Sequence, residues 1–224
     1  TVGAGQLIAM VGLNGSGKST LLRTIAGLQP ALGGNIELGR KPIENLSHTD
    51  IARQVSVVLT HAQAVNNMTV GNLVALGRYP YTNFTGRLAF QGGAVVAEAI
   101  KKVGIGHLAE RQLGAISDGE RQRAMIARAL AQQTKLILMD EPTAYLDTVN
   151  RAHTLKLLRE LTTDSGRSII FSTHDLSLAA QVADILWLVH NGKLETGNIE
   201  TLIKSDTFLN VFNSDSVTFD TENY

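Results

Sequence analysis

Short apolar runs alternate along much of the chain with stretches in which apolar residues recur every three or four positions. The runs predict buried strands, and the recurring positions predict amphipathic helices. The expected strands cover residues 6–11, 34–39, 55–59, 135–139, 168–172 and 185–189. The expected helices cover residues 19–26, 148–163 and 176–182. Strands separated by helices are typical of a mostly parallel sheet with helices on both faces, so the pattern indicates the α/β class.

The pattern changes between residues 68 and 133, where the signals are mostly helical. Apolar residues there recur at helical spacing, as at Val70, Leu73 and Val74. We therefore expect residues 1–67 and 134–224 to form one α/β core. Residues 68–133 are expected to form a helical subdomain inserted into that core.

A glycine-rich segment follows the first expected strand and precedes the first expected helix. Residues 12–19 read Gly-Leu-Asn-Gly-Ser-Gly-Lys-Ser, which matches the phosphate-loop pattern G-x-x-x-x-G-K-[ST]. Glycines let successive backbone N–H groups curl around phosphate oxygens, and the helix dipole adds to the attraction. Lys18 is expected to reach the β- and γ-phosphates, and the Ser19 hydroxyl to ligate Mg²⁺. The expected nucleotide-binding residues here are Gly12, Leu13, Asn14, Gly15, Ser16, Gly17, Lys18, Ser19 and Thr20.

Two carboxylates, Asp140 and Glu141, directly follow the strand expected at residues 135–139. In open parallel sheets ligands bind at the carboxyl ends of the strands, so Asp140 is expected next to Ser19, where it would hold Mg²⁺. Glu141 is placed to orient or deprotonate a water for in-line attack on a γ-phosphate. The two segments together predict hydrolysis of a nucleoside triphosphate.

Composition narrows the classes of function. The 224 residues carry 20 Lys+Arg and 20 Asp+Glu, and this zero net charge argues against a nucleic-acid partner. The absence of cysteine excludes disulfides, thiolate metal sites and a cysteine nucleophile. The apolar runs are shorter than the roughly 20 residues of a membrane-spanning helix. Because the chain begins at Thr1 and reaches a strand within a few residues, we expect it to be trimmed at the N-terminus.

Three further segments follow the phosphate loop. Residues 116–123 read Ile-Ser-Asp-Gly-Glu-Arg-Gln-Arg, residues 140–147 read Asp-Glu-Pro-Thr-Ala-Tyr-Leu-Asp, and residues 172–175 read Ser-Thr-His-Asp. They resemble the signature sequence, the Walker B segment with its D-loop, and the H-loop of ABC-type ATPases. All four motifs stand in that family's order, and the resemblance covers nearly the whole chain. It implies a P-loop NTPase core with an inserted helical subdomain that carries the signature.

The resemblance implies ATP and Mg²⁺ as cofactors, with two ATP molecules sandwiched between two copies of the chain. Ser117 and Gly119 of one copy would bind the γ-phosphate held by the phosphate loop of the other copy. His174 would contact that phosphate and position the attacking water, and so join Glu141 and Lys18 in the expected catalytic set. Asp147 would help to join the two copies.

The signature segment also carries a helix-start pattern that does not depend on the family resemblance. Ser117 and Glu120 form the S-x-x-E pattern of a capping box, which predicts that a helix begins there. Asp118 and Glu120 stand where the family usually has Gly and Gln, and their side chains are expected to point away from the triphosphate.

A second difference from the family's usual sequence follows the strand expected at residues 55–59. Thr60 stands where the family usually has Gln, and we expect its hydroxyl to reach Mg²⁺ or a water on it. Gln63 is the alternative, if the loop register differs. The aromatic residue that stacks on adenine in the family is expected in the trimmed N-terminal segment.

Residues 70–81 resemble the ATPase subunits of importers for iron–siderophore complexes, haem and cobalamin. In that branch the stretch usually lies where the ATPase meets the transmembrane subunit, and Arg78, Tyr79 and Tyr81 are expected to be exposed there. The resemblance implies a peripheral subunit at the cytoplasmic face of the plasma membrane. Its partners would be transmembrane permease subunits, a second copy and, indirectly, a substrate-binding protein. Two alternatives stay open: a soluble ABC ATPase of cluster assembly or DNA repair, and a regulatory module that binds ATP with little hydrolysis.

Overall fold

The sheet at the centre of the fold has the strand order β4-β5-β6-β1-β7-β8. The structure is a computed structural model that describes residues 1–60, 67–82 and 92–212. The strands are β1 (Leu7–Val11), β4 (Val55–Val58), β5 (Leu136–Met139), β6 (Ser168–Ser172), β7 (Ile185–His190) and β8 (Lys193–Gly197). Neighbouring strands are parallel except for the antiparallel pair β7–β8. The predicted α/β fold with a mostly parallel sheet is therefore confirmed.

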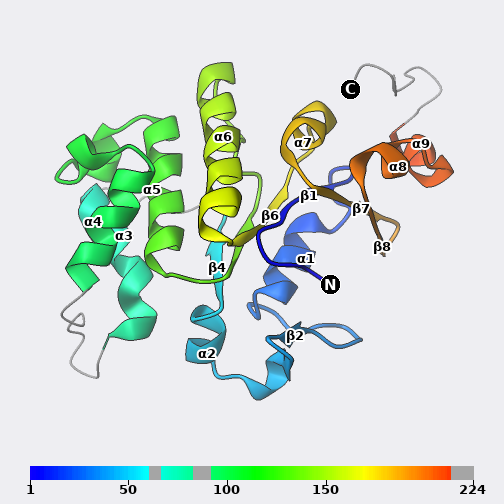
Figure 1. Cartoon of the computed structure of the whole chain (residues 1–224), viewed down its shortest axis with the longest axis horizontal. Helices are drawn as coiled ribbons and strands as arrows, with labels where there is room; N and C mark the ends of the chain where they lie inside the picture. The colour runs from blue at the N-terminus through cyan, green and yellow to red at the C-terminus, as the bar shows by residue number, and fades with distance from the viewer. Residues whose placement is uncertain (61–66, 83–91, 213–224) are drawn as a thin grey trace.

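Strand β1 shows why helices cover both faces of the sheet. Leu7 and Ala9 belong to one buried cluster, and Ile8 and Met10 belong to another, because alternate residues of a strand face opposite sides. Helices α6 (Thr148–Ser165) and α7 (Leu176–Val182) contribute to the first cluster. Helices α1 (Lys18–Ile25) and α2 (His48–Ala52) contribute to the second, on the opposite face (Figure 1).

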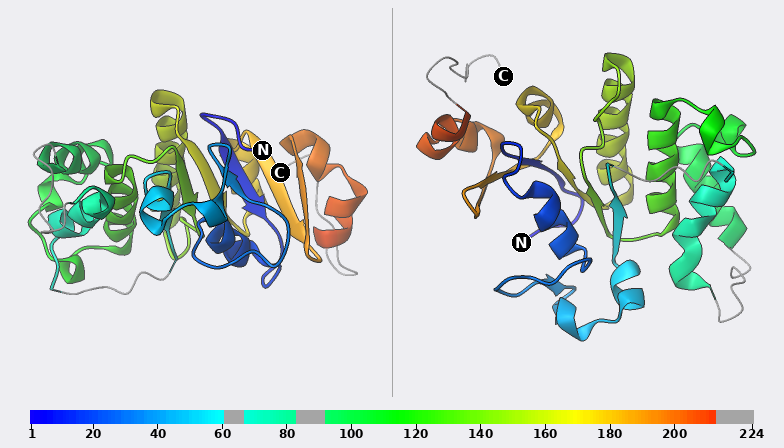
Figure 2. Two further views of the ribbon diagram at one scale, coloured as in Figure 1. Left: turned by 90° about the horizontal axis from the view of Figure 1, so that it is seen from below. Right: turned by 180° about the vertical axis from the view of Figure 1, so that it is seen from behind.

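The described residues between β4 and β5 fold into helices that gather beside the edge strand β4 (Figures 1 and 2). They are α3 (Val70–Ala75), α4 (Gly92–Lys102) and α5 (Asp118–Ala131), with the 3-10 segments η2 (Leu76–Tyr81), η3 (Gly106–Leu108) and η4 (Leu113–Ala115). Within this described stretch α5 contacts both α3 and α4. The division at residues 68 and 133 stays a prediction.

Several short elements were not expected from the sequence. The strand expected at residues 34–39 is reduced to β2 (Glu37–Leu38), which pairs with β3 (Lys41–Pro42). Gly39 and Arg40 between them both have positive φ, as a tight hairpin turn requires. The other additions are η1 (Ile43–Asn45), α2, β8, α8 (Ile199–Ile203) and α9 (Asp206–Phe212). Among the described helices, none is long and apolar enough to cross a bilayer.

The expectation that Arg78, Tyr79 and Tyr81 are all exposed is wrong for Arg78 and Tyr81. Arg78 is only 7% exposed, and its Nη1 donates a hydrogen bond of 2.8 Å to the carbonyl of Ala131. The Tyr81 hydroxyl donates to the carbonyl of Gln132 at 3.0 Å, and its ring lies 4.0 Å from the Arg78 guanidinium carbon. Together they satisfy carbonyls at the end of α5, which have no partner within the helix. Tyr79 alone is exposed, at 76%.

The buried arginine gives a first prediction about stability. Replacing Arg78 by Ala removes a charge-assisted hydrogen bond and a ring contact, and it leaves helix carbonyls unpaired. We expect Arg78→Ala to lower the free energy of unfolding by about 3 kcal/mol. The matched variant Tyr79→Ala removes an exposed side chain from the same segment and is expected to change it by less than about 0.5 kcal/mol. Urea unfolding of both variants measures the difference, and equal midpoints would refute this role of Arg78.

Candidate nucleotide-binding site

Four parallel strands deliver residues of the expected site to the same edge of the sheet. Gly12 follows β1, Thr60 lies just beyond β4, Asp140 follows β5, and His174 lies just beyond β6. Because β4, β5, β6 and β1 run parallel, their carboxyl ends meet at one edge, which is where such sheets bind ligands. The order of the strands thus brings together residues that lie far apart in the sequence.

The loop from Gly12 to Gly17 connects β1 to α1. Gly12 has φ +155°, and a Cβ there would lie 2.3 Å from the carbonyl oxygen of Val189, so a side chain cannot be accommodated. Gly17 has φ +103° and is the N-cap of α1, where no side chain caps the helix. Ser16 Oγ is buried and has no hydrogen-bond partner among the described residues. An uncapped helix N-terminus with an unpartnered hydroxyl fits phosphate oxygens.

Lys18 is the first residue of α1, and its side chain is buried against the loop. Its Nζ donates hydrogen bonds to the carbonyls of Gly12 at 2.8 Å and Leu13 at 3.1 Å. Burial lowers the pKa of Lys18, whereas the nearby carboxylates of Glu141 and Asp140 oppose this shift. The ammonium group therefore lies between the loop and the acidic strand end.

Asp140 is the centre of a hydrogen-bond network at this edge. Its Oδ1 accepts from Ser19 Oγ at 2.9 Å and from Ser172 Oγ at 2.7 Å. Its backbone carbonyl accepts from Thr60 Oγ1 at 2.8 Å. The expected metal-binding residues Ser19, Asp140 and Thr60 are thus brought together, and their hydroxyl and carboxylate oxygens are of the type that suits Mg²⁺. Gln63, the alternative to Thr60, lies outside the described residues.

Ser172 opens the Ser-Thr-His-Asp segment at residues 172–175, but no role was predicted for its own side chain. Besides its bond to Asp140, its Oγ accepts a hydrogen bond of 2.9 Å from the backbone N–H of Glu141. Apart from its place in that segment, its signal is a polar residue at the end of a run of apolar residues, in a strand that pairs with β5. Ser172 thereby fixes both carboxylate residues relative to β6.

Glu141 and His174 approach each other just beyond the strand ends. His174 Nδ1 lies 3.7 Å from Glu141 Oε1, and both side chains are partly exposed. Glu141 has φ +47°, a left-handed conformation that is uncommon for a residue with a side chain. Such backbone strain is often found at functional sites. Glu141 and His174 are therefore close enough for one water to contact both.

The signature segment lies at the start of α5, and the predicted capping box is confirmed. Ser117 Oγ accepts from the N–H of Glu120, and Glu120 Oε2 accepts from the N–H of Ser117 at 2.8 Å and from its Oγ at 2.9 Å. These bonds lower the pKa of Glu120. Glu120 therefore folds back onto Ser117, whereas Asp118 is exposed and lies 3.6 Å from Arg121.

The start of α5 does not lie beside the phosphate loop of its own chain. Helix α5 packs beside β4, and β5 and β6 separate β4 from β1. At about 4.8 Å per strand, β4 and β1 are roughly 14 Å apart. The structure therefore brings Lys18, Ser19, Asp140, Glu141 and His174 together and leaves Ser117 and Gly119 at a distance.

Comparisons with known proteins agree with this geometry. The sequence profile of the ABC transporter family matches residues 1–144. The achromobactin transport ATP-binding protein CbrD of Dickeya dadantii is 42% identical over 187 residues, which cover 84% of this chain and 70% of that protein. The iron(3+)-hydroxamate import ATP-binding protein FhuC of Bacillus subtilis is 36% identical over 211 residues, which cover 94% of this chain and 76% of that protein.

A solved structure extends the likeness to three dimensions. It is an inward-facing ABC transporter assigned to the metal-chelate type, with a TM-score of 0.83 and 28% sequence identity. The match covers 94% of this chain and 79% of that one. With a phosphate loop, an acidic strand end and a capped signature helix in this fold, the chain belongs to the ABC transporter family and is an ATP-binding domain of that family.

Proposed function

We propose that this chain is the ATP-hydrolysing subunit of an importer for a metal chelate. The observation that carries the proposal is the network of Ser19, Asp140 and Ser172, with Lys18 and Glu141 beside it. This site combines an anion-binding loop, oxygen ligands for Mg²⁺ and a carboxylate near the position where water would attack the γ-phosphate. Phosphate release from ATP by the purified protein tests this, and no release above background from the protein with its permease would reject it.

Each residue has a distinct task in this proposal. The loop N–H groups and Lys18 bind the phosphates, and Ser19 and Asp140 hold the metal, with Thr60 alongside. When bound, Mg²⁺ would offset the negative charge of the phosphates. Glu141 accepts the proton of the attacking water, and His174 orients that water.

A second copy of the chain would complete the site. Ser117 and Gly119 lie too far from their own phosphate loop to contact its γ-phosphate, whereas a rotated copy could place them there. Exposed apolar side chains are found in both the phosphate loop and the segment around Asp147, namely Leu13, Tyr145 and Val149. Their burial between two copies would stabilise a closed dimer with two ATP molecules.

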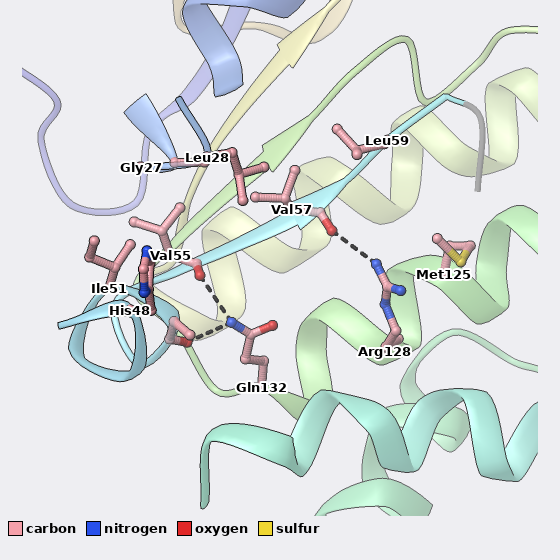
Figure 3. A pocket seen from close by; sticks show the side chains of 12 residues that line it. Gly27, Leu28, His48, Ile51, Val55, Val57, Leu59, Met125, Arg128 and Gln132 are labelled. Atoms are coloured by element: carbon pink, nitrogen blue, oxygen red, sulfur yellow. Dashed lines mark hydrogen bonds between the residues drawn. The ribbon is translucent and has the colours of Figure 1, made fainter. Parts of the chain in front are cut away.

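A groove of about 490 Å³ lies between the core and α5 (Figure 3). Leu28, Ile51 and Val57 give it apolar walls. Arg128 and Gln132 of α5 donate hydrogen bonds to the carbonyls of Val57 and Val55, so the edge strand β4 is covered there (Figure 3).

The groove is a suitable site for a cytoplasmic helix of the permease. Helix α2 forms one wall, and Arg53 just after α2 donates two hydrogen bonds to the carbonyl of Pro80 in η2. The groove therefore adjoins the segment at residues 70–81, in which the exposed Leu76 and Tyr79 could extend the contact.

The groove gives a prediction with a matched control. Leu28 is 60% exposed and lines the groove, so Leu28→Glu adds a charge where an apolar partner would bind without disturbing the core. We expect co-purification with the permease, and stimulation of ATP hydrolysis by it, to fall at least tenfold. Leu32 is fully exposed and does not line the groove, so Leu32→Glu should leave both unchanged. Equal behaviour of the two variants would reject the groove as the docking site.

The transported substrate is a proposal drawn from relatives, because it does not contact this chain. FhuC is named for iron(3+)-hydroxamate import, and the structural relative is of the metal-chelate type. We therefore favour a ferric chelate over haem or a corrinoid. In this proposal the subunit binds its permease at the cytoplasmic face of the plasma membrane, and a substrate-binding protein delivers the chelate to the opposite face.

A further inference from the structure

The first turns of α5 and α6 pack against each other within one chain. A Cβ on Gly119 would lie 2.7 Å from both Cγ and Oδ1 of Asn150, so the Asn150 side chain would have to move to admit it. The Asn150 amide therefore occupies the space that a side chain at Gly119 would need. The absence of a side chain at Gly119, which is itself buried, thus leaves room for the side chain of Asn150 from α6.

The same amide is held by the N-cap of α6. Asn150 Nδ2 donates to Asp147 Oδ2 at 2.8 Å, and the Asn150 backbone N–H donates to Asp147 Oδ1 at 2.8 Å. These hydrogen bonds lower the pKa of Asp147. A side-chain amide held by two hydrogen bonds within its own turn has little freedom to move away from Gly119.

The next residue connects the same turn of α6 to the segment beside His174. Arg151 Nη1 lies 3.4 Å from Asp175 Oδ2, and Asp175 caps the start of α7. The first turn of α6 therefore contacts the signature segment through Asn150 and the residue after His174 through Arg151. A displacement of this turn would move both segments together.

We propose that Asn150 is a positioning residue that fixes the Ser117–Gly119 segment relative to Asp147 of the same chain. The inference rests on the proposed function, in which Ser117 and Gly119 bind ATP held by a second copy and Asp147 lies where the copies meet. When two copies close, the amide of Asn150 transmits the position of Asp147 to the signature. The contacts that the described structure gives the Asn150 side chain are with Asp147 and Gly119, and none of them is with the phosphate loop.

Two substitutions test the two contacts of the amide. Asn150→Ala removes both contacts, and Asn150→Asp keeps the shape but removes the donor to Asp147. Both are expected to lower kcat for ATP hydrolysis about tenfold, as the loss of one or two hydrogen bonds allows. The Hill coefficient for ATP should fall toward 1, and the Kd for ATP at dilute protein should stay within about twofold. Asn35→Ala, at an exposed position before β2, is the matched amide control and should behave as wild type.

A double-mutant cycle with Asp147→Ala separates positioning from general destabilisation. If Asn150 acts through Asp147, the double variant should be no slower than the slower single variant. Additive losses, an unchanged kcat in either Asn150 variant, or a loss of ATP affinity in step with kcat would each overturn the inference. If the wild type itself does not hydrolyse ATP, the proposed function fails, and that outcome is distinguished by the wild-type assay alone.

Discussion

Replacing Glu141 by Gln is expected to abolish ATP turnover while ATP binding is retained. Gln keeps the size of the side chain and the backbone N–H bond to Ser172, but it cannot accept a proton from the attacking water. Loss of a general base costs roughly 10² to 10⁴ in rate, so kcat should fall at least about 100-fold. Steady-state phosphate release measures the loss, and equilibrium binding of ATP should show a Kd within about twofold of wild type.

A control for this variant is available on α6. Glu160 is about half exposed and lies 3.9 Å from Lys156 on the surface of that helix, so Glu160→Gln makes the same chemical change away from the site. It should hydrolyse ATP at the wild-type rate. Normal turnover in the Glu141 variant would remove this carboxylate from the mechanism and would favour His174 or another group as the base.

Replacing Lys18 by Ala is expected to have the largest effect on ATP binding. Lys18 Nζ is held at the loop carbonyls, where it can turn to phosphate oxygens, and no other described lysine lies in the loop. A charge-assisted hydrogen bond is worth about 1.5–3 kcal/mol, so the Kd for ATP should rise roughly 10- to 100-fold. Titration of ATP by calorimetry measures the change.

The folded state should tolerate this substitution. Burial of the Lys18 side chain costs desolvation, which lowers its pKa, and removing a buried charge relieves that cost, so the melting temperature should stay within a few degrees of wild type. Lys41→Ala, at an exposed position of β3, is the matched control and should bind ATP normally. Unchanged affinity in the Lys18 variant would refute the assignment of residues 12–19 as the phosphate loop.

The core of the fold and the composition of the site could be predicted because they depend on strong local patterns. Apolar runs located β1, β4, β5, β6 and β7, and a parallel sheet then required that the residues after β1 and β5 meet at one edge. The bond between Ser19 and Asp140, which lie 121 positions apart, follows from that rule. The capping box of Ser117 and Glu120 is equally local, and it was predicted correctly.

What could not be predicted depends on long-range packing. Arg78 follows the pattern of an exposed interface residue, but the unpaired carbonyls at the end of α5 draw it into the fold. Asn150 has no motif, and its contact with Gly119 arises only because the first turns of α5 and α6 meet. Ser172 is one polar residue at a strand end, and its role depends on the register that places β6 next to β5.

The central claim is that ATP hydrolysis by this chain drives uptake of a ferric chelate. The most direct measurement is uptake of radiolabelled ferric hydroxamate by cells that carry either the wild-type protein or the Glu141→Gln variant as their only copy, with equal amounts of permease. We predict uptake with the wild type and none above background with the variant. Equal uptake in the two strains would contradict the account.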